Sequence, residues 1–502
     1  MKSKKALYNI VTEFIYQFVV VVCSFVLPKL ILNSYGSEYN GIIQSITQFL
    51  SYISLLTLGI SGSTRVAIYK AKGDNIQISK VVKATQNYMK KVTFAFVAYV
   101  LILTFLYPLI IKSEIPPIYV SILVIIIGIG TLFEYAFGVT YSALISALQS
   151  KYIYNIILIF LKILSTVISV VLILNNQSIF AVKLIGSICF ALGPILLNKI
   201  VNKKFNLTMN VEPDDKALSQ KRDVMAHSIA NCVHEYTDIF LLSLFIGPKM
   251  VSIYSIYNLV LNGIKKIQTM FTNGLEGAFG EMWAKGENNN FERNFYTFEF
   301  LIFSLISVLF TCTTFLLLPF IKLYTKGVND VNYILPLFAY FSILATATMC
   351  IRTPYIIAVQ SAGKYKETKN GAIVEAIINA GVSLLLINQL GIVGVTIGTL
   401  SANIFRTIQY EIYTSKNLVK RSNIIFIKRI LILIICFGIS FLIKNLLPEI
   451  NVENWKQWIY SGIIYFIISL SVTFIISVIF YKTELKESLK LVKKMFKKKG
   501  KN

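Results

Sequence analysis

Residues 152–174 form the stretch YIYNIILIFLKILSTVISVVLIL, in which Lys162 is the single charged residue. An α-helix of this length extends about 35 Å, enough to cross the hydrocarbon core of a bilayer. Similar apolar stretches recur along the 502 residues, and only 15% of the chain is charged. A soluble domain carries about 25% charged residues. The composition therefore excludes an ordinary soluble enzyme and predicts an all-α polytopic membrane protein.

The apolar stretches are sufficient for about 14 transmembrane helices. A helical bundle is expected because a backbone in lipid must satisfy its hydrogen bonds within the same helix. The predicted spans lie near residues 8–32, 42–64, 92–112, 118–145, 152–174, 178–200, 224–247, 250–280, 296–322, 332–360, 371–389, 392–415, 425–447 and 457–481.

The chain is strongly basic, with 49 Lys and Arg against 24 Asp and Glu and a formal net charge of +25. With the N-terminus placed in the cytoplasm, 36 basic residues fall in inside segments and 6 in outside loops. Loops rich in Lys and Arg stay on the cytoplasmic side. The bias predicts that both termini are cytoplasmic and that the basic loops and tail lie against anionic lipid. We therefore expect the basic residues to interact with the lipid bilayer and not with nucleic acid.

The sequence contains no catalytic motif that would make this chain an enzyme. It lacks the Gly-x-x-x-x-Gly-Lys-Ser/Thr loop of ATPases and any recognisable Ser/His/Asp or Cys/His hydrolytic set. The six cysteines lie in apolar stretches without a Cys-x-x-Cys pair, so they predict neither a disulfide framework nor a zinc site. We expect no cofactor beyond a coupling proton or Na⁺.

Short segments recur at nearly one offset, which indicates an internal duplication. Three pairs of segments are separated by 211 to 213 residues: 147–150 and 358–361, 36–39 and 247–250, 71–74 and 284–287. The pairs predict two six-helix lobes in a duplicated arrangement, followed by two extra C-terminal helices. The expected bounds are 1–210 for the N-lobe, 211–420 for the C-lobe, and 421–502 for the extra helices and basic tail. Duplicated halves suit transport by alternating access about a site near the bilayer midplane.

Polar residues line one face of the predicted seventh span. His227, Asn231, His234 and Asp238 follow one another at helical spacing. Ionisable residues within a span usually face the protein interior or a water-filled cavity. His234 and Asp238 are therefore candidates to bind a coupling proton or Na⁺. Two histidines without a third ligand make a poor zinc site, so no metal centre is expected.

Basic residues within or beside the spans predict a cationic cavity. The candidate substrate-binding residues are Lys265, Arg65, Lys162, Arg352, Asn262 and Asn258. Lys and Arg form strong hydrogen bonds with phosphate oxygens, so the cavity would accept an anionic head such as a pyrophosphate, and the asparagines suit sugar hydroxyls. The alternative interpretation is hydrogen bonding between helices for the asparagines, and snorkelling to the inner leaflet for Arg352 and Arg406.

Glu375 is matched to Lys162 by the repeat, at an offset of 213. The two halves thus carry opposite charges at one equivalent position. The two side chains can pair with each other, or each can line the cavity. We include Glu375 with His234 and Asp238 as a candidate ion-coupling residue.

A loose pattern of short motifs carries a family resemblance over the whole chain. The motifs are Tyr35-Gly36-Ser37-Glu38-Tyr39-Asn40-Gly41, Leu58-Gly59-Ile60 with Arg65, Thr237-Asp238-Ile239 with Gly247 and Tyr254-Ser255, Ala362-Gly363-Lys364, Asn379 and Gly391-Ile392-Val393-Gly394. With them the chain resembles the polysaccharide-unit (Wzx-type) flippases of the multidrug/oligosaccharidyl-lipid/polysaccharide (MOP) exporter superfamily. The resemblance implies two six-helix lobes, a central cationic cavity and a cargo of sugar units on undecaprenyl pyrophosphate.

The resemblance also implies a cellular location, a pathway and protein partners. It indicates a flippase in the bacterial cytoplasmic membrane that serves capsule, O-antigen or exopolysaccharide assembly, with a polysaccharide polymerase and a chain-length regulator as partners. Related flippases of the peptidoglycan precursor have an arginine-rich first span, whereas residues 8–32 contain no arginine. The alternatives are a small-molecule exporter of the same superfamily and a polysaccharide polymerase, which would normally need a sizeable basic outer loop.

Overall fold

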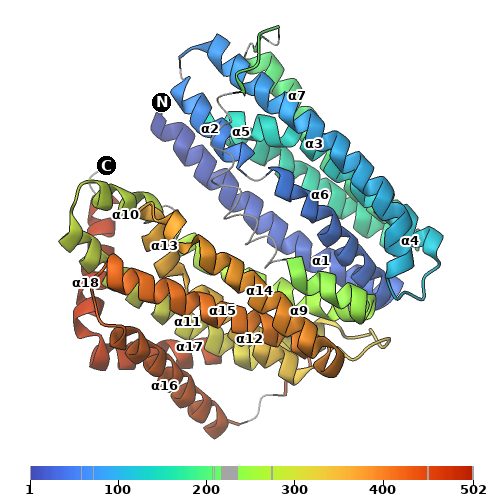
Figure 1. Ribbon diagram of the computed structural model, residues 1–502. Coiled ribbons are helices and arrows are strands. Elements are labelled where there is room, and N and C mark those ends of the chain that lie inside the picture. The colour runs from blue at the N-terminus through green and yellow to red at the C-terminus, as the bar shows by residue number, and fades with distance from the viewer. Residues whose placement is uncertain are drawn as a thin grey trace. The chain divides into compact units, whose positions relative to one another are not determined.

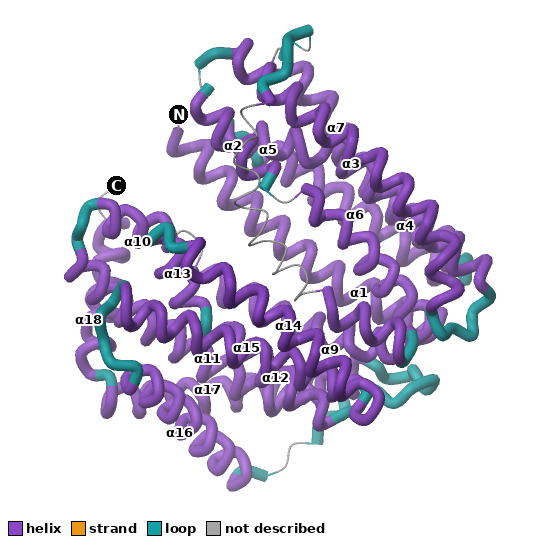
Figure 2. The backbone as a smooth tube through the Cα atoms, viewed as in Figure 1, coloured by secondary structure: helices purple, strands orange, loops and turns teal. Residues whose placement is uncertain are grey.

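The computed structural model describes residues 2–57, 59–71, 73–205, 207–208, 210–215, 236–272, 275–448 and 451–499. Throughout these ranges every regular element is a helix, which confirms the all-α fold class (Figures 1 and 2). The chain forms two compact units. The N-terminal unit comprises Met1–Ser255 and Gly327–Val331, and the C-terminal unit comprises Ile256–Lys326 and Asn332–Asn502.

The N-terminal unit is a bundle of long helices that lie side by side (Figure 1). Its labelled elements are α1 (Lys2–Ser51), η1 (Tyr52–Thr57), α2 (Ile60–Lys70), α3 (Asn75–Ile110), α4 (Pro117–Phe133), η2 (Glu134–Gly138), α5 (Val139–Ala147), α6 (Tyr152–Leu174) and α7 (Ile179–Phe205). Asp74 caps α3, because its carboxylate accepts hydrogen bonds from the backbone N–H groups of Ile76 and Gln77.

The C-terminal unit is a second helical bundle, and α9 (Pro248–Thr272) enters it at Ile256. Its other elements are α10 (Leu275–Ala284), α11 (Asn288–Tyr324), α12 (Pro336–Ile351), α13 (Thr353–Ser361), α14 (Tyr365–Leu390), α15 (Ile392–Asn417), α16 (Ile424–Leu446), α17 (Trp455–Phe480) and α18 (Lys482–Lys499). Helices α16 and α17 correspond to the two extra spans expected at the C-terminus. They pack on α11, where the Trp458 indole donates to the Leu316 carbonyl at 3.2 Å.

Ten helical stretches in the described ranges are long and apolar enough to cross a membrane. One of them, Leu7–Lys70, contains the first two predicted spans, which meet at a kink at Gly36. Helices α9 and α15 match two further predicted spans but fall outside the ten, because charged residues such as Lys265 and Arg406 lower their hydropathy. The predicted span near 224–247 is described only as a helix over Tyr236–Phe245.

The turns that the repeat predicted coincide with left-handed backbone. Gly36 has φ 83° and its counterpart Gly247 has φ 120°. Gly73 has φ 103° and its counterpart Gly286 has φ 71°. Glycine adopts these angles without the steric cost that a side chain brings. The recurrence at matched positions supports the predicted duplication, whereas the expected lobe bounds stay a prediction.

Two predicted spans are interrupted, which the hydropathy pattern did not indicate. The span near 118–145 is divided into α4 and α5 by the π-helix η2. The span near 332–360 is divided into α12 and α13 at Arg352. Pro354 lies in the first turn of α13 and has no N–H to donate to the Cys350 carbonyl. Gln268 from α9 donates to that carbonyl instead, at 2.8 Å.

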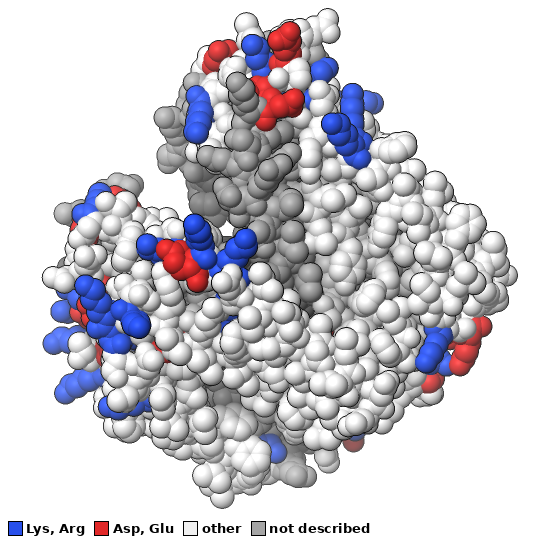
Figure 3. Space-filling view, viewed as in Figure 1, with Lys and Arg blue, Asp and Glu red and all other residues white. Residues whose placement is uncertain are grey.

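The visible surface carries few charges. In Figure 3 most of the face drawn holds neither basic nor acidic side chains, and the charged ones gather in small groups. Large apolar side chains are exposed along the spans, among them Phe94, Phe105, Leu109 and Leu385, each at least 72% exposed. Such a surface matches hydrocarbon rather than water, and a multi-pass membrane protein follows.

Candidate functional site

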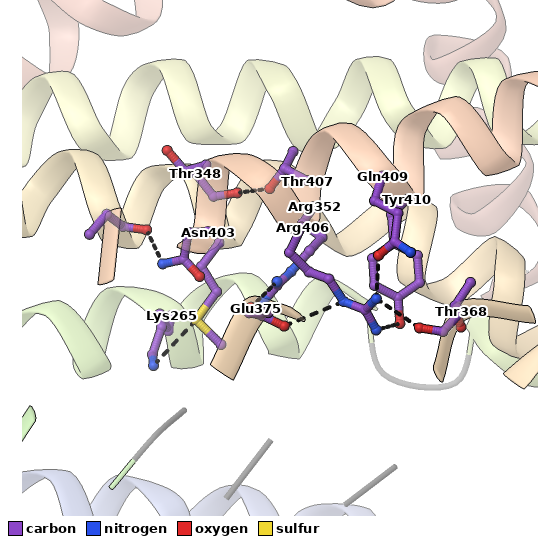
Figure 4. Close-up of polar contacts among 12 residues, drawn as sticks. Lys265, Thr348, Arg352, Thr368, Glu375, Asn403, Arg406, Thr407, Gln409 and Tyr410 are labelled. Atoms are coloured by element: carbon purple, nitrogen blue, oxygen red, sulfur yellow. Dashed lines mark hydrogen bonds and ion pairs between the residues drawn. The ribbon is translucent and has the colours of Figure 1, made fainter. Parts of the chain in front are cut away.

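Three charged side chains form a buried ion cluster inside the C-terminal unit (Figure 4). Arg352 lies at the break between α12 and α13, Glu375 on α14 and Arg406 on α15, and none is more than 5% exposed. One carboxylate oxygen of Glu375 lies 2.5 Å from Arg352 Nη1, and the other lies 3.3 Å from Arg406 Nε. Because the three residues come from different helices, the cluster holds the centre of this unit together.

Arg406 is fixed by contacts on nearly every side of its guanidinium. Nη1 donates to the Thr368 carbonyl at 2.8 Å and to the Gln409 side-chain oxygen, and Nη2 donates to the Tyr410 hydroxyl at 3.2 Å. The guanidinium also lies 4.3 Å from the centre of the Tyr410 ring, a cation–π contact. Arg406 therefore has a structural role, and the snorkelling expected for it at an inner leaflet does not occur, since its side chain is 1% exposed.

The cluster is cationic, with two guanidinium groups against one carboxylate. Arg352 Nε is buried without a hydrogen-bond partner, and so is the side-chain oxygen of Asn403, one turn from Arg406. The Asn403 amide donates to the Ala345 carbonyl at 3.0 Å. Buried polar atoms are normally paired, and unpaired ones mark places where water, an ion or a ligand is accommodated.

Lys265 lies beside this cluster on α9 and is part-buried. Its Nζ contacts the Met349 sulfur at 3.9 Å, and it has no acidic partner among the described residues. Gln268, one turn after Lys265 on α9, donates to the Cys350 carbonyl of α12. This hydrogen bond holds α9 against α12 next to Lys265. A cation held in place without a counter-charge is the kind of group that binds an anionic ligand.

An apolar groove of about 580 Å³ opens between α11, α12, α15 and α16. Its walls include Phe310, Leu344, Ile408 and Leu433, and its few polar groups are hydroxyls. Two of these, Thr348 and Thr407, contact each other through a 3.2 Å hydrogen bond from the Thr407 hydroxyl to the Thr348 carbonyl (Figure 4). Thr348 lies one turn before Arg352, and Thr407 follows Arg406 directly. The same two helices thus carry the groove wall and the buried cations.

The other candidate residues of the C-terminal unit are Asn258 and Asn262 on α9. Asn258 is part-buried and Asn262 is exposed. Glu375, expected to pair with Lys162 or line a cavity, pairs with Arg352 and Arg406 of its own unit.

The remaining candidates belong to the N-terminal unit. Arg65 on α2 is exposed and donates to the Ser61 carbonyl at 3.3 Å. Lys162 on α6 is part-buried. Asp238 is 3% exposed and accepts a 2.6 Å hydrogen bond from the Tyr254 hydroxyl. His227, Asn231 and His234 of the same predicted polar face lie outside the described residues.

Sequence reasoning missed a second buried cluster of charges around Glu299 on α11. Glu299 is fully buried, and both its oxygens lie 2.6 Å from the guanidinium of Arg421, which precedes α16. Arg429 Nε lies 2.9 Å away, and the Tyr355 hydroxyl also donates to this carboxylate. The signal was present, because Glu299 is an acidic residue inside a predicted span.

The arrangement can therefore bind both the apolar part and the anionic part of one amphiphilic molecule. The helices α12 and α15 border an apolar groove on one side and a cationic, partly unsatisfied cluster on the other. Lys265 adds a cation without a counter-charge. Within the described residues no group of His, Cys, Asp and Glu could hold a metal ion.

No family model matches the sequence, and no curated protein sequence does. Solved structures do match. The lipid II flippase MurJ in an inward closed conformation superimposes with a TM-score of 0.72 at 14% identity, covering 94% of this chain and 99% of that one. A MOP superfamily transporter from Pyrococcus furiosus gives a TM-score of 0.60 at 13% identity, covering 84% and 97%. This chain has the MOP transporter fold.

A third similar structure is an inward-facing multidrug resistance transporter of the MATE family, also of the MOP superfamily. It gives a TM-score of 0.56 at 14% identity and covers 80% of this chain and 94% of that one. The likeness to the MOP fold extends over most of the chain and over nearly the whole of each of these proteins. At such identities the likeness establishes the fold, while the expected Wzx-type subgroup stays a prediction.

Proposed function

We propose that this chain is a flippase that moves undecaprenyl-pyrophosphate-linked oligosaccharide units across the bacterial cytoplasmic membrane by alternating access. The units would serve cell-surface polysaccharide assembly. The observation that carries the proposal is the juxtaposition of the apolar groove with the cationic cluster on α12 and α15. A cargo with a long apolar tail and a diphosphate head needs both kinds of surface.

The groove favours this cargo over a small hydrophilic one. A volume of about 580 Å³ lined almost wholly by aliphatic and aromatic side chains suits an isoprenoid segment. Lys265 is our first candidate for the diphosphate, because it lacks a counter-charge among the described side chains. Arg352 offers the unpaired Nε to the same head group. Asn258 and Asn262, further along α9, would meet the sugars.

We also propose that movement of the cargo is coupled to movement of a proton or Na⁺. The membrane potential, negative inside, also favours the exit of an anion from the cytoplasm, at about 2.3 kcal/mol per charge per 100 mV. Of the ion-coupling candidates, the structure describes Asp238 and Glu375. Glu375 pairs with two arginines, so Asp238 is the candidate that we favour. A polysaccharide polymerase and a chain-length regulator would act on the delivered units.

The test is transbilayer movement in proteoliposomes. Fluorescent undecaprenyl-pyrophosphate oligosaccharide is incorporated, and its exposure to a membrane-impermeant quencher is followed over time. Lys265→Ala removes the uncompensated cation, so we expect at least about tenfold slower flipping, the loss of roughly one charge-assisted hydrogen bond. Lys266→Ala is the matched control, because Lys266 is the next residue on α9 and lies about 100° around the helix.

Each outcome separates one part of the proposal. Fast flipping by wild type and Lys266→Ala, with slow flipping by Lys265→Ala, supports both the class and the site. Equal rates in all three keep the class and remove Lys265 from the site. Absence of flipping by the wild type, together with export of small organic cations, would place the protein among the drug exporters.

A further inference from the structure

The π-helix η2 interrupts a membrane span at an acidic residue. Glu134 is the first residue of η2, which lies within the apolar stretch Pro117–Ala147. A π-turn is rare, and it occurs frequently at functional sites. An ionisable residue within a span is costly and is rarely found without a function. The two features coincide at one position in the N-terminal unit.

The Glu134 carboxyl lies among tyrosines. The Tyr154 hydroxyl from α6 donates to Glu134 Oε2 at 3.3 Å. Tyr16 from α1 and Tyr135 from η2 itself lie close enough to interact with it electrostatically. Helices α3, α4, α5 and α7 also pack on η2. Among the described residues none of them presents a charged group to this carboxyl, and α4 and α5 contain no charged residue. Glu134 therefore has no cationic partner in the described part of the chain.

The Glu134 carboxyl occupies space that is free because residue 138 is a glycine and has no side chain. A Cβ atom at position 138 would lie 2.3 Å from Glu134 Oε2 and 2.4 Å from its carboxyl carbon. The carboxyl is thus folded back along its own π-turn and against the Tyr154 hydroxyl. It is only part-buried by solvent accessibility, so it can exchange with its surroundings without unfolding of the helix.

The surroundings favour a proton over a metal ion as the ligand of Glu134. A sodium ion needs several oxygen ligands, whereas the only hydrogen-bonding side chain on Glu134 within the described ranges is one tyrosine hydroxyl. No metal-binding group of acidic, His or Cys side chains occurs among the described residues. An isolated carboxylate in an apolar span is strongly disfavoured, and protonation removes its charge.

We propose that Glu134 is a proton-binding site whose loading and release accompany the transport cycle. In the loaded state the carboxyl is neutral, and its O–H is retained in the tyrosine-lined site. On release the O–H bond breaks, the electron pair stays on Glu134 and the proton passes to a water molecule. Glu13 provides the contrast, because its carboxylate lies 2.9 Å from Lys151 Nζ and so has a cationic partner. Only the transport readout below rests on the proposed flippase function.

Proton binding is measured first, on the purified full-length protein without any cargo. Infrared difference spectra between alkaline and acidic buffer follow the C=O stretch of protonated carboxyl groups. Above about pH 6 exposed Asp and Glu remain ionised, so in that range we expect a titrating band in wild type that disappears in Glu134→Gln and persists in Glu13→Gln. Gly138→Ala keeps the carboxyl but displaces it, so the band is expected to move in frequency and in midpoint. A band that survives unchanged in Glu134→Gln, or no band in wild type, overturns the proposal.

Coupling is measured second, in proteoliposomes with fluorescent undecaprenyl-pyrophosphate oligosaccharide and an imposed gradient of one pH unit. Such a gradient biases a one-proton step by at most about tenfold. Wild type and Glu13→Gln should respond to the gradient, and Glu134→Gln should flip at one rate whatever the gradient. An unchanged gradient response in Glu134→Gln contradicts the coupling. A titrating band in a protein that flips no lipid-linked sugar would leave the proton site intact and reject the flippase function instead.

Discussion

At the scale of single residues, buried carboxylates organise the C-terminal unit. Glu299 pairs with Arg421 and Arg429, just as Glu375 pairs with Arg352 and Arg406. Burial would lower the pKa of Arg421, but hydrogen bonds and attraction from Glu299 outweigh it and raise that pKa. Each carboxylate serves two guanidiniums. Loss of Glu299 would leave Arg421 without its ion-pair partner and Arg429 with only the longer contact to Glu484, at 3.8 Å.

Glu299→Gln should therefore destabilise the protein by about 3–5 kcal/mol, the usual cost of removing one partner of a buried pair. The measurement is the midpoint of thermal unfolding in detergent, followed by the accessibility of the buried cysteines to a thiol-reactive dye. Glu292→Gln, two turns earlier on the same face of α11, is the control and should lie within about 0.5 kcal/mol of wild type. Equal midpoints for Glu299→Gln and wild type would show that the cluster contributes little.

At the scale of elements, two glycines allow α14 and α15 to pack closely. Gly394 and Gly398 are four residues apart on α15 and form a small-xxx-small pattern. A Cβ on Gly398 would lie 2.1 Å from Ser383 Oγ and 2.8 Å from the Ser383 backbone nitrogen. Ser383 also donates to the Val395 carbonyl at 3.2 Å. The close contact brings Glu375 on α14 within reach of Arg406 on α15.

Gly398→Ala should push the two helices apart and cost about 1–3 kcal/mol, the usual effect of overpacking. Gly381→Ala on α14 is the matched control, since a Cβ there meets nothing within 4 Å. It should be neutral or slightly stabilising, because alanine favours the helix. Thermal unfolding in detergent distinguishes the two variants, and equal stabilities would mean that the hairpin accommodates the extra methyl group.

At the scale of the whole molecule, the charge bias predicts which ends of the helices face the cytoplasm. Lys285 and Lys326 flank α11 at its two ends, and both are exposed. Positive-inside counting puts Lys285 inside and Lys326 outside. In intact cells a membrane-impermeant maleimide should label Lys326→Cys and should label Lys285→Cys only after permeabilisation. The reverse pattern would invert the topology and with it the cytoplasmic placement of both termini.

Much of this architecture was predictable from the sequence, because the bilayer imposes a length and a hydropathy on each span. The turns at Gly36 and Gly247 and the duplication were predicted separately, from short segments that recur at an offset of 211 to 213 residues. Which charged side chains meet was not predictable, since periodicity places Glu375 on a face but does not say that two arginines face it. The π-turn at Glu134 was missed for the same reason, as local geometry leaves no trace in hydropathy.

The polarity of α15 has a consequence for how the protein is made. Arg406, near the middle of this helix, carries an insertion penalty of about 2.5–3.5 kcal/mol at a bilayer centre when it stands alone. Its partner Glu375 lies on α14, which is synthesised first. An α15 that left the translocon by itself would bring an unpaired charge into lipid. We therefore expect the two helices to enter the membrane together as one hairpin, in which the pairing of Arg406 with Glu375 lowers this penalty.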